Sequence, residues 1–420
     1  MDSTKIKPLL LILIAALAIR LAACGGWQWR FGERFFFGDS DGYWALGRAV
    51  AQGGPYQYGP DQVFRAPGYP LLLAPLFLAA HGQPPILWGR VESAVLGTLA
   101  VAAVWWLGRE LFDDRVGRLA ALLAAFYPGA IVLSSVVLSE APFCALAVAQ
   151  LALWVRATKT AATRRAATLA VAAGVVGGAA ILTRPSWLLF APLAVAVSLL
   201  LRGRSWRRAA LGVCVLLGSL AALTPWWVRN AVVTHHFVPT TLQVGASLYD
   251  GLNPRATGAS DMRWGQTIAA DERKHLPKGG GVSVDSPEYR VDRRLRREAM
   301  QWAGEHPWQV VRLAGAKLAR VWNIWPNEAQ FSAWPVRLLV VFTYVPIVIL
   351  GIIGARRTVG RGWPYGVCWL PAVYLSLIHA IFVSSLRYRE PALLPWMVLA
   401  AAALLRTGPK DTNQELSTKN

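Results

Sequence analysis

Three observations predict an all-α polytopic membrane protein. Of the 420 residues, 55% are hydrophobic and only 16% are charged, with a mean hydropathy of +0.38. Several apolar stretches approach the roughly 20 residues that a helix needs to cross a hydrocarbon core. The Lys and Arg residues, which bring the formal net charge to +20, are spread between these stretches. This composition is too apolar for one or two soluble domains.

The apolar runs, taken in order, predict ten spanning helices. The first, Pro8 to Cys24, resembles a signal peptide. Arg20 lies near its end, and no small-x-small cleavage site precedes a soluble domain, so we interpret it as a retained helix. The other nine are Trp88 to Leu107, Leu119 to Val137, Pro142 to Val155, Ala166 to Leu182, Trp187 to Leu201, Ala209 to Thr224, Pro335 to Ile353, Pro364 to Val383 and Pro391 to Leu405.

The basic loops indicate the topology. One alternating path through ten helices places every short basic loop on the same side, which the positive-inside rule makes the cytoplasmic side. Both termini are then cytoplasmic, and residues 25–87, 138–141, 183–186, 225–334 and 384–390 are outer connections. The inner basic groups are Lys5/Lys7, Arg109/Arg115/Arg118, Arg156/Lys159/Arg164/Arg165, Arg202/Arg204/Arg207/Arg208, Arg356/Arg357/Arg361 and Arg406/Lys410.

This topology divides the chain into four parts. They are an N-terminal transmembrane module (1–224), an outer segment (225–334), C-terminal helices (335–406) and a polar tail (407–420) that we expect to be disordered. The run Pro67 to Ala80 does not fit the alternation and contains three prolines, so we expect a juxtamembrane or re-entrant helix at the outer face. The stretch from His306 to Trp322 suits either an interfacial helix or a surface helix packed on the bundle.

Several functional classes are disfavoured. The basic residues are dispersed between apolar segments, so we expect no nucleic-acid partner. Soluble-enzyme motifs such as GxxxxGK[ST], HExxH and GxSxG are absent from the sequence. The cysteines lie in or beside apolar segments without CxxC spacing, which favours inert small hydrophobic residues over disulfides or a metal site. They are Cys24, Cys144, Cys214 and Cys368.

Acidic and basic residues meet at the outer face. Asp39, Asp41 and Arg65 belong to the first outer loop, and three further outer loops carry Glu140, Arg184 and the run from Arg387 to Glu390. Charged residues at helix ends usually face the bundle interior or a wet cavity. For Asp39 the alternative is capping of the following helix, and for each Arg it is snorkelling to lipid headgroups. We interpret Arg20 and the pair Arg90 and Glu92 as packing or headgroup contacts.

Taken in this order, six short segments resemble the GT-C superfamily of polyprenyl-phosphate-sugar-dependent glycosyltransferases. The resemblance is to bacterial family 39-like enzymes, related to protein mannosyltransferases and aminoarabinose transferases, and it covers most of the chain. It implies a GT-C type helical bundle with two juxtamembrane helices in the first outer loop and a cavity at the outer face. The segments are Asp39-Ser40-Asp41-Gly42-Tyr43, Arg65-Ala66-Pro67-Gly68-Tyr69-Pro70-Leu71-Leu72-Leu73, Leu138-Ser139-Glu140-Ala141-Pro142, Leu182-Thr183-Arg184-Pro185, Pro225-Trp226-Trp227-Val228-Arg229-Asn230 and Arg387-Tyr388-Arg389-Glu390-Pro391.

The resemblance also implies site residues. The catalytic aspartate falls on Asp39, with Asp41 as the second choice. Arg65 stands where aminoarabinose-transferase relatives carry a lysine that contacts the donor phosphate. Glu140 matches a second acidic position, and whether it orients the acceptor or binds a metal stays open. The substrate-binding residues implied are Asp41, Tyr43, Arg65, Tyr69, Glu140, Arg184, Arg387, Tyr388 and Arg389.

The triplet Asp39-Ser40-Asp41 also has the DxD form of a nucleotide-sugar metal motif. The cytosolic α/β domain that would use such a motif is absent from the pattern of apolar runs. We therefore expect no cofactor and no essential metal, while a divalent metal stays an open alternative.

The resemblance, together with the charged outer face, implies an inverting glycosyltransferase, and the resemblance alone implies a bacterial inner membrane. The enzyme would move a sugar from a polyprenyl-phosphate donor to a lipid, glycan or protein acceptor on the periplasmic or extracytoplasmic face. An aspartate base would activate the acceptor, and Arg65, Arg387 and Arg389 would stabilise the departing phosphate. One alternative is a transporter or flippase of lipid-linked or anionic substrates, although we find neither repeated halves nor a mid-membrane acidic pair. Another is a non-enzymatic receptor that displays the outer segment.

Overall fold

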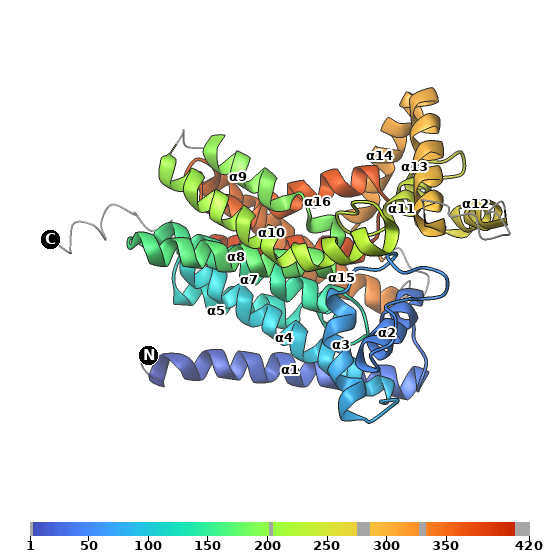
Figure 1. Ribbon diagram of the computed structural model, residues 1–420. Coiled ribbons are helices and arrows are strands. Elements are labelled where there is room, and N and C mark those ends of the chain that lie inside the picture. The colour runs from blue at the N-terminus through green and yellow to red at the C-terminus, as the bar shows by residue number, and fades with distance from the viewer. Residues whose placement is uncertain (1–2, 201–204, 275–285, 327–332, 408–420) are drawn as a thin grey trace.

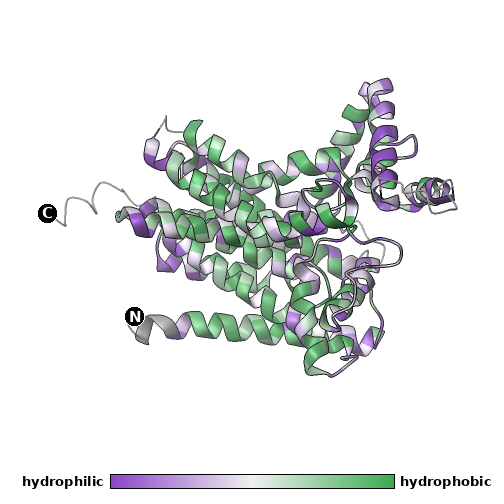
Figure 2. Cartoon of the chain, viewed as in Figure 1, coloured by the Kyte–Doolittle hydropathy of each residue, from purple (hydrophilic) through white to green (hydrophobic). Residues whose placement is uncertain are grey.

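The computed structural model describes residues 3–200, 205–274, 286–326 and 333–407. These residues form helices joined by short irregular connections, and they contain no named strand. The long helices run side by side along the direction of α1 (Ser3–Phe31) (Figure 1). Hydrophobic residues occupy the middle of the long helices, and hydrophilic residues gather at the two ends of the bundle (Figure 2). This distribution is the one expected of a bundle that spans a bilayer.

Among the described residues, six helices are long and apolar enough to cross a membrane, and each contains a predicted span. One is the Lys7–Phe31 part of α1. The other five are α4 (Ile86–Leu111), α7 (Glu140–Lys159), α8 (Thr163–Thr183), α10 (Trp206–Thr234) and α15 (Trp334–Val359).

The four other predicted spans are shorter or interrupted helices. The run predicted as one helix from Leu119 to Val137 is divided into α5 (Asp114–Phe126) and α6 (Pro128–Leu133), because Pro128 lacks the N–H that would continue α5. Interrupted helices are tolerated at membrane depth where protein surrounds them. The other three regions form η1 (Pro185–Trp187) with α9 (Phe190–Leu200), η3 (Tyr365–Cys368) with α16 (Leu370–Ile381), and α17 (Glu390–Leu404).

The helix α10 is longer than predicted. It continues through Pro225 to Thr234, whereas the sequence predicts an end at Thr224. Its neighbour α8 approaches it closely, because a Cβ atom on Gly174 would lie only 2.1 Å from the carbonyl oxygen of Val215. Gly178 follows one turn later, giving the small-xxx-small spacing that allows membrane helices to pack backbone against backbone.

The helix α17 lies inside the bundle. It packs against α4, α5, α7, α15 and α16, and nearly all of its side chains are buried. The loop before it, η4 (Leu386–Arg389), is therefore anchored to the centre of the molecule at one of its ends.

Basic residues of the predicted inner loops meet at one end of the bundle. Arg156 lies 3.5 Å from the carboxylate of Glu110, and Arg207 donates a hydrogen bond to the carbonyl of Thr158 over 2.9 Å. These contacts join the three connections that follow α4, α7 and α9. We infer that the three predicted inner loops share one side.

The opposite end carries the short helices. The first outer loop forms α2 (Gly38–Ala51) and α3 (Gly68–Ala79), which pack together through Trp44, Leu73 and Phe77. The predicted pair of juxtamembrane helices is therefore present. The outer segment forms α11 (Val244–Gly251), α12 (Arg263–Lys274), α13 (Pro287–Glu305) and α14 (Pro307–Val321) at the same end (Figure 1). The Gly-rich stretch of the outer segment at 278–281 and the polar tail after 407 lie outside the described residues.

Two predicted packing roles are confirmed. Arg20 is 1% exposed and donates hydrogen bonds to the carbonyls of Ala16 and Ala125. Arg90 donates to the carbonyls of Gly32 and Arg34, where α1 ends. The four cysteines are free thiols.

Candidate active site

Asp39 lies in the first turn of α2 and joins two distant parts of the chain. Its Oδ1 lies 2.8 Å from a guanidinium nitrogen of Arg65, and its Oδ2 lies 2.8 Å from one of Arg387. The N-cap of α2 is Phe37, and no side chain caps the helix. The alternative that Asp39 serves as a helix cap is therefore wrong.

Opposing effects act on the Asp39 carboxylate, whose side chain is 30% exposed. Burial alone would raise its pKa, because the charged form loses hydration. The charges and hydrogen bonds of Arg65 and Arg387 outweigh burial and hold the pKa of Asp39 well below its usual range. The group is therefore a carboxylate bridging two guanidinium groups.

A second acidic residue, Glu140, also faces Arg387. Glu140, the first residue of α7, is 1% exposed and lies 2.7 Å from a guanidinium nitrogen of Arg184. Nε of Arg387 lies 3.5 Å from the same Glu140 oxygen, and Arg184 donates a hydrogen bond to the hydroxyl of Ser139 over 3.3 Å. Arg387 therefore stands between the two carboxylates.

Aromatic rings line these guanidinium groups. The Arg65 guanidinium lies 5.1 Å from the ring centre of Tyr43, whose hydroxyl donates to Ser139 over 3.3 Å. The ring of Tyr388 lies 5.1 Å from Arg184 and 5.0 Å from Arg387. Such rings stabilise a guanidinium through its positive charge while restricting where it can move.

The hydrogen bonds of three other predicted site residues lead away from the two carboxylates. Asp41 is exposed on α2 and accepts a hydrogen bond from Tyr58 over 2.7 Å. Tyr69 is fully buried in the core between α2, α3 and α4, where its hydroxyl bonds to Ser93. Arg389 stacks 3.8 Å from the ring of Tyr344 and donates to the carbonyl of Asn323.

Sequence reasoning missed two contributors to the cluster. Ser139 accepts hydrogen bonds from Tyr43 and Arg184, and it directly precedes Glu140 in the matched motif. His379 stacks on Tyr388 with ring centres 4.5 Å apart. His379 could have been identified as a polar residue within an apolar run, since ionisable residues inside membrane helices usually have a specific partner.

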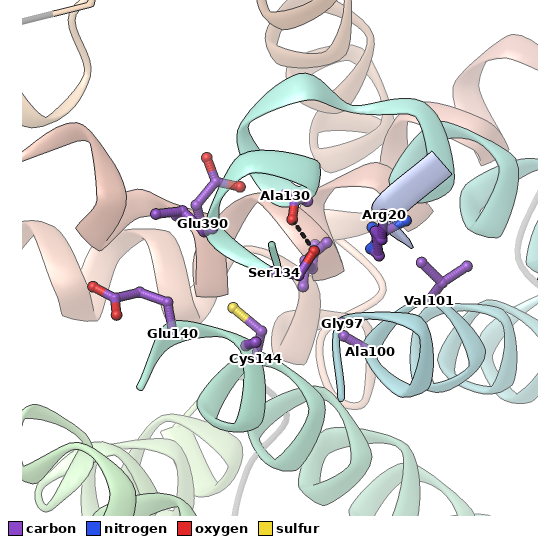
Figure 3. A pocket seen from close by; sticks show the side chains of 12 residues that line it. Arg20, Gly97, Ala100, Val101, Ala130, Ser134, Glu140, Cys144 and Glu390 are labelled. Carbon is purple, nitrogen blue, oxygen red and sulfur yellow. Dashed lines mark hydrogen bonds between the residues drawn. The ribbon is translucent and has the colours of Figure 1, made fainter. Parts of the chain in front are cut away.

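A small cavity lies behind Glu140, with a volume of about 20 Å³. Glu140 and Glu390 lie on one side of it, and Arg20 and Ser134 lie further along its lining (Figure 3). One Glu390 oxygen has no hydrogen-bond partner among the described residues. The volume is enough for about one water molecule, which would hydrogen-bond to this Glu390 oxygen.

Nowhere in the described residues do three or more His, Cys, Asp or Glu side chains gather closely enough to hold an ion. Asp39 and Glu140 each face guanidinium groups, whose positive charge opposes a cation at the same oxygens. We derive no step through a metal.

The chain was compared with known proteins. The family model for dolichyl-phosphate-mannose-protein mannosyltransferase matches residues 65–228. No curated protein matches.

Among solved structures, the archaeal oligosaccharyltransferase AglB from Archaeoglobus fulgidus, in complex with an inhibitory peptide and a dolichol-phosphate, matches with a TM-score of 0.59 and 16% identity. The match covers 94% of this chain and 50% of that one, so the chain spans about half the length of this relative. The apo form of that enzyme matches with a TM-score of 0.54 and 16% identity, over 93% of this chain and 50% of that one.

ArnT from Cupriavidus metallidurans bound to undecaprenyl phosphate matches with a TM-score of 0.46 and 18% identity, over 94% of this chain and 77% of that one. The fold that the sequence motifs imply is confirmed, and this chain is an integral membrane protein with the GT-C type fold.

Proposed function

We propose that this protein is a membrane glycosyltransferase that moves a sugar from a polyprenyl-phosphate donor to an acceptor, with inversion at the anomeric carbon. The observation that carries the proposal is the Asp39 carboxylate held between Arg65 and Arg387. The carboxylate is a candidate base. The two guanidinium groups complement the negative charge and the geometry of a phosphate.

The reaction breaks the bond between the anomeric carbon and the donor phosphate oxygen. The acceptor hydroxyl or amine forms the new bond from the opposite face and gives its proton to Asp39, which is open enough to pass it to solvent. The lipid phosphate departs with the bonding electrons. Arg65 and Arg387 stabilise the charge that develops on it, which is the main task of a site with a good leaving group.

Donor binding would also activate the base. In the free protein, Arg65 and Arg387 lower the proton affinity of Asp39 and so weaken it as a base. An anionic phosphate competes for both guanidinium groups and would displace the carboxylate. Asp39 then loses two positive neighbours, and its pKa rises toward that of an ordinary aspartate.

The expected side of the membrane is the periplasmic or extracytoplasmic one. The basic loops that follow α4, α7 and α9 meet at the end opposite α2 and α3, and such loops favour the cytoplasm. Both termini are then cytoplasmic, and the membrane is a bacterial inner membrane by the resemblance of the motifs. The acceptor is a lipid, a glycan or a protein.

The test is sugar transfer by the purified protein and its Asp39→Asn variant, with Asp41→Asn as the matched control from the same helical turn. Radiolabelled polyprenyl-phosphate hexoses and pentoses serve as donors, and membrane extract supplies the acceptor. Removal of a general base costs about 10² to 10⁴ in rate, so we expect Asp39→Asn to lose transfer and Asp41→Asn to retain it.

Two other results would change the assignment. Loss of transfer in Asp41→Asn, with transfer retained in Asp39→Asn, would move the base to Asp41. Donor binding without transfer across the whole panel would favour the transporter or flippase.

A further inference from the structure

The outer segment contacts both loops that carry the arginines around Asp39. We propose that Glu288 and Lys317 are positioning residues that hold Arg65 and Arg387 close enough to bind a single donor phosphate. The proposal rests on the proposed function, and it adds a role for the segment between α10 and α15.

Glu288 holds the loop before Arg65. It lies in the first turn of α13 and is 8% exposed. Its carboxylate accepts hydrogen bonds from the backbone N–H of Gln62 over 2.9 Å and of Val63 over 3.0 Å. Val63 also accepts a backbone hydrogen bond from Leu242. The position of Arg65 therefore depends on Glu288, which lies more than two hundred positions further along the chain.

Additional contacts hold the same loop. Arg273 of α12 lies 2.6 Å from the carboxylate of Asp61. Tyr56 donates its hydroxyl to the carbonyls of Arg65 and Ala66 over 3.2 and 3.1 Å. Glu288 is the one of these groups that binds two consecutive backbone N–H groups.

Lys317 holds the other loop. Its side chain is fully buried in α14, and its ammonium donates to the carbonyl of Ile381 over 2.6 Å and of Ala380 over 3.4 Å. These carbonyls belong to the last turn of α16, which lacks intrahelical donors and carries partial negative charge. Burial lowers the pKa of Lys317 to about 8, and the nearby carboxylate of Asp250 opposes that shift.

The outer segment packs closely against the end of α16 near Lys317. A Cβ atom on Gly251 would lie 2.8 Å from the carbonyl oxygen of Ile381. The carbonyl of Gly258 accepts a hydrogen bond from the N–H of Ser384 over 3.1 Å, three residues before Arg387. The start of the Arg387 loop is thus attached to the outer segment.

Glu288 and Lys317 belong to two connected helices, α13 and α14. α13 and α14 are separated only by His306, and they pack with α11 around Leu252, Ala299 and Trp302. Glu288 and Lys317 thus lie on the same pair of helices. A shift of this pair changes the distance between the arginines, because Glu288 is bonded to the backbone of the Arg65 loop and Lys317 to the end of α16, from which the Arg387 loop begins.

The experiment measures the affinity of the purified full chain for undecaprenyl phosphate and for uncharged undecaprenol in detergent. The variants are Lys317→Met and Glu288→Gln, with the exposed Arg312→Met of α14 and Glu305→Gln of α13 as matched controls. At metal sites, loss of a residue that orients a ligand costs about tenfold or more in affinity. By analogy, we expect a phosphate affinity about tenfold lower and an unchanged polyprenol affinity. Lys317→Arg, which keeps the charge, should restore most of the difference.

A role limited to folding would lower both affinities together, and that result would overturn the proposal. Wild-type phosphate affinity in folded Lys317→Met and Glu288→Gln would also overturn it, while leaving the proposed function intact. If Lys317→Met does not fold, Glu288→Asp decides, because its shorter reach should weaken phosphate binding alone. Absence of phosphate binding by the wild-type protein would remove the proposed function and this inference together.

Discussion

The Asp39 carboxylate stabilises the folded protein through its contacts with Arg65 and Arg387. A carboxylate with a lowered pKa in the folded state contributes stability above its unfolded pKa of about 3.8 and loses it as the pH falls toward the folded value. The wild-type protein should therefore lose more thermal stability between about pH 4 and pH 2 than Asp39→Asn, which has no carboxylate to protonate. The measurement is the melting temperature of the purified protein across this range.

Asp41→Asn is the matched control for this prediction. Asp41 is exposed, and its recorded contact is a hydrogen bond from Tyr58, so its removal should leave the pH dependence of the wild type. Parallel curves for the wild type and Asp39→Asn would show that the two arginines do not stabilise the Asp39 carboxylate.

At the level of helices, α8 and α10 pack backbone against backbone. A methyl group on Gly174 would meet the carbonyl oxygen of Val215 at 2.1 Å, so Gly174→Ala must push the two backbones apart. Overpacking of this kind costs about 1–3 kcal/mol. We expect Gly174→Ala to lower the melting temperature in detergent.

Gly26→Ala on α1 is the control for this helix contact, because its methyl group would meet no atom within 4 Å. Alanine also favours the helix over glycine, so Gly26→Ala should be neutral or stabilising. Equal melting temperatures for the two variants would mean that α8 and α10 can separate without cost.

For the whole molecule, the positions of the loops predict which residues are accessible from outside the cell. Gln57 lies in the first outer loop, and Ala161 lies in the basic connection between α7 and α8. A membrane-impermeant maleimide should label Gln57→Cys in intact cells and Ala161→Cys only after permeabilisation. Unwanted labelling would come from Cys214, the one native cysteine that is not buried, so both variants also carry Cys214→Ala. The opposite labelling pattern would place the site in the cytoplasm.

Residue roles at the site were only partly predictable. Asp39, Arg65 and Arg387 were proposed from their motifs, and they meet although Asp39 and Arg387 are 348 positions apart. The neighbouring Arg389 was proposed as well, yet it contacts Tyr344 instead. Two arginines separated by one residue look alike in a sequence, and only the turn of η4 directs them to different partners.

The sequence by itself determined the membrane class, the six long spans, the side shared by the basic loops and the juxtamembrane helix after Pro67. These features depend on the length of apolar runs and on charge between them, and both are local properties. The tertiary structure decided that Asp39 bridges two arginines rather than capping α2, that Tyr69 belongs to the core, and that Glu288 and Lys317 face the arginine loops. These arrangements depend on contacts between residues far apart in the chain, where the balance between burial and charge is set by neighbours that no local pattern contains.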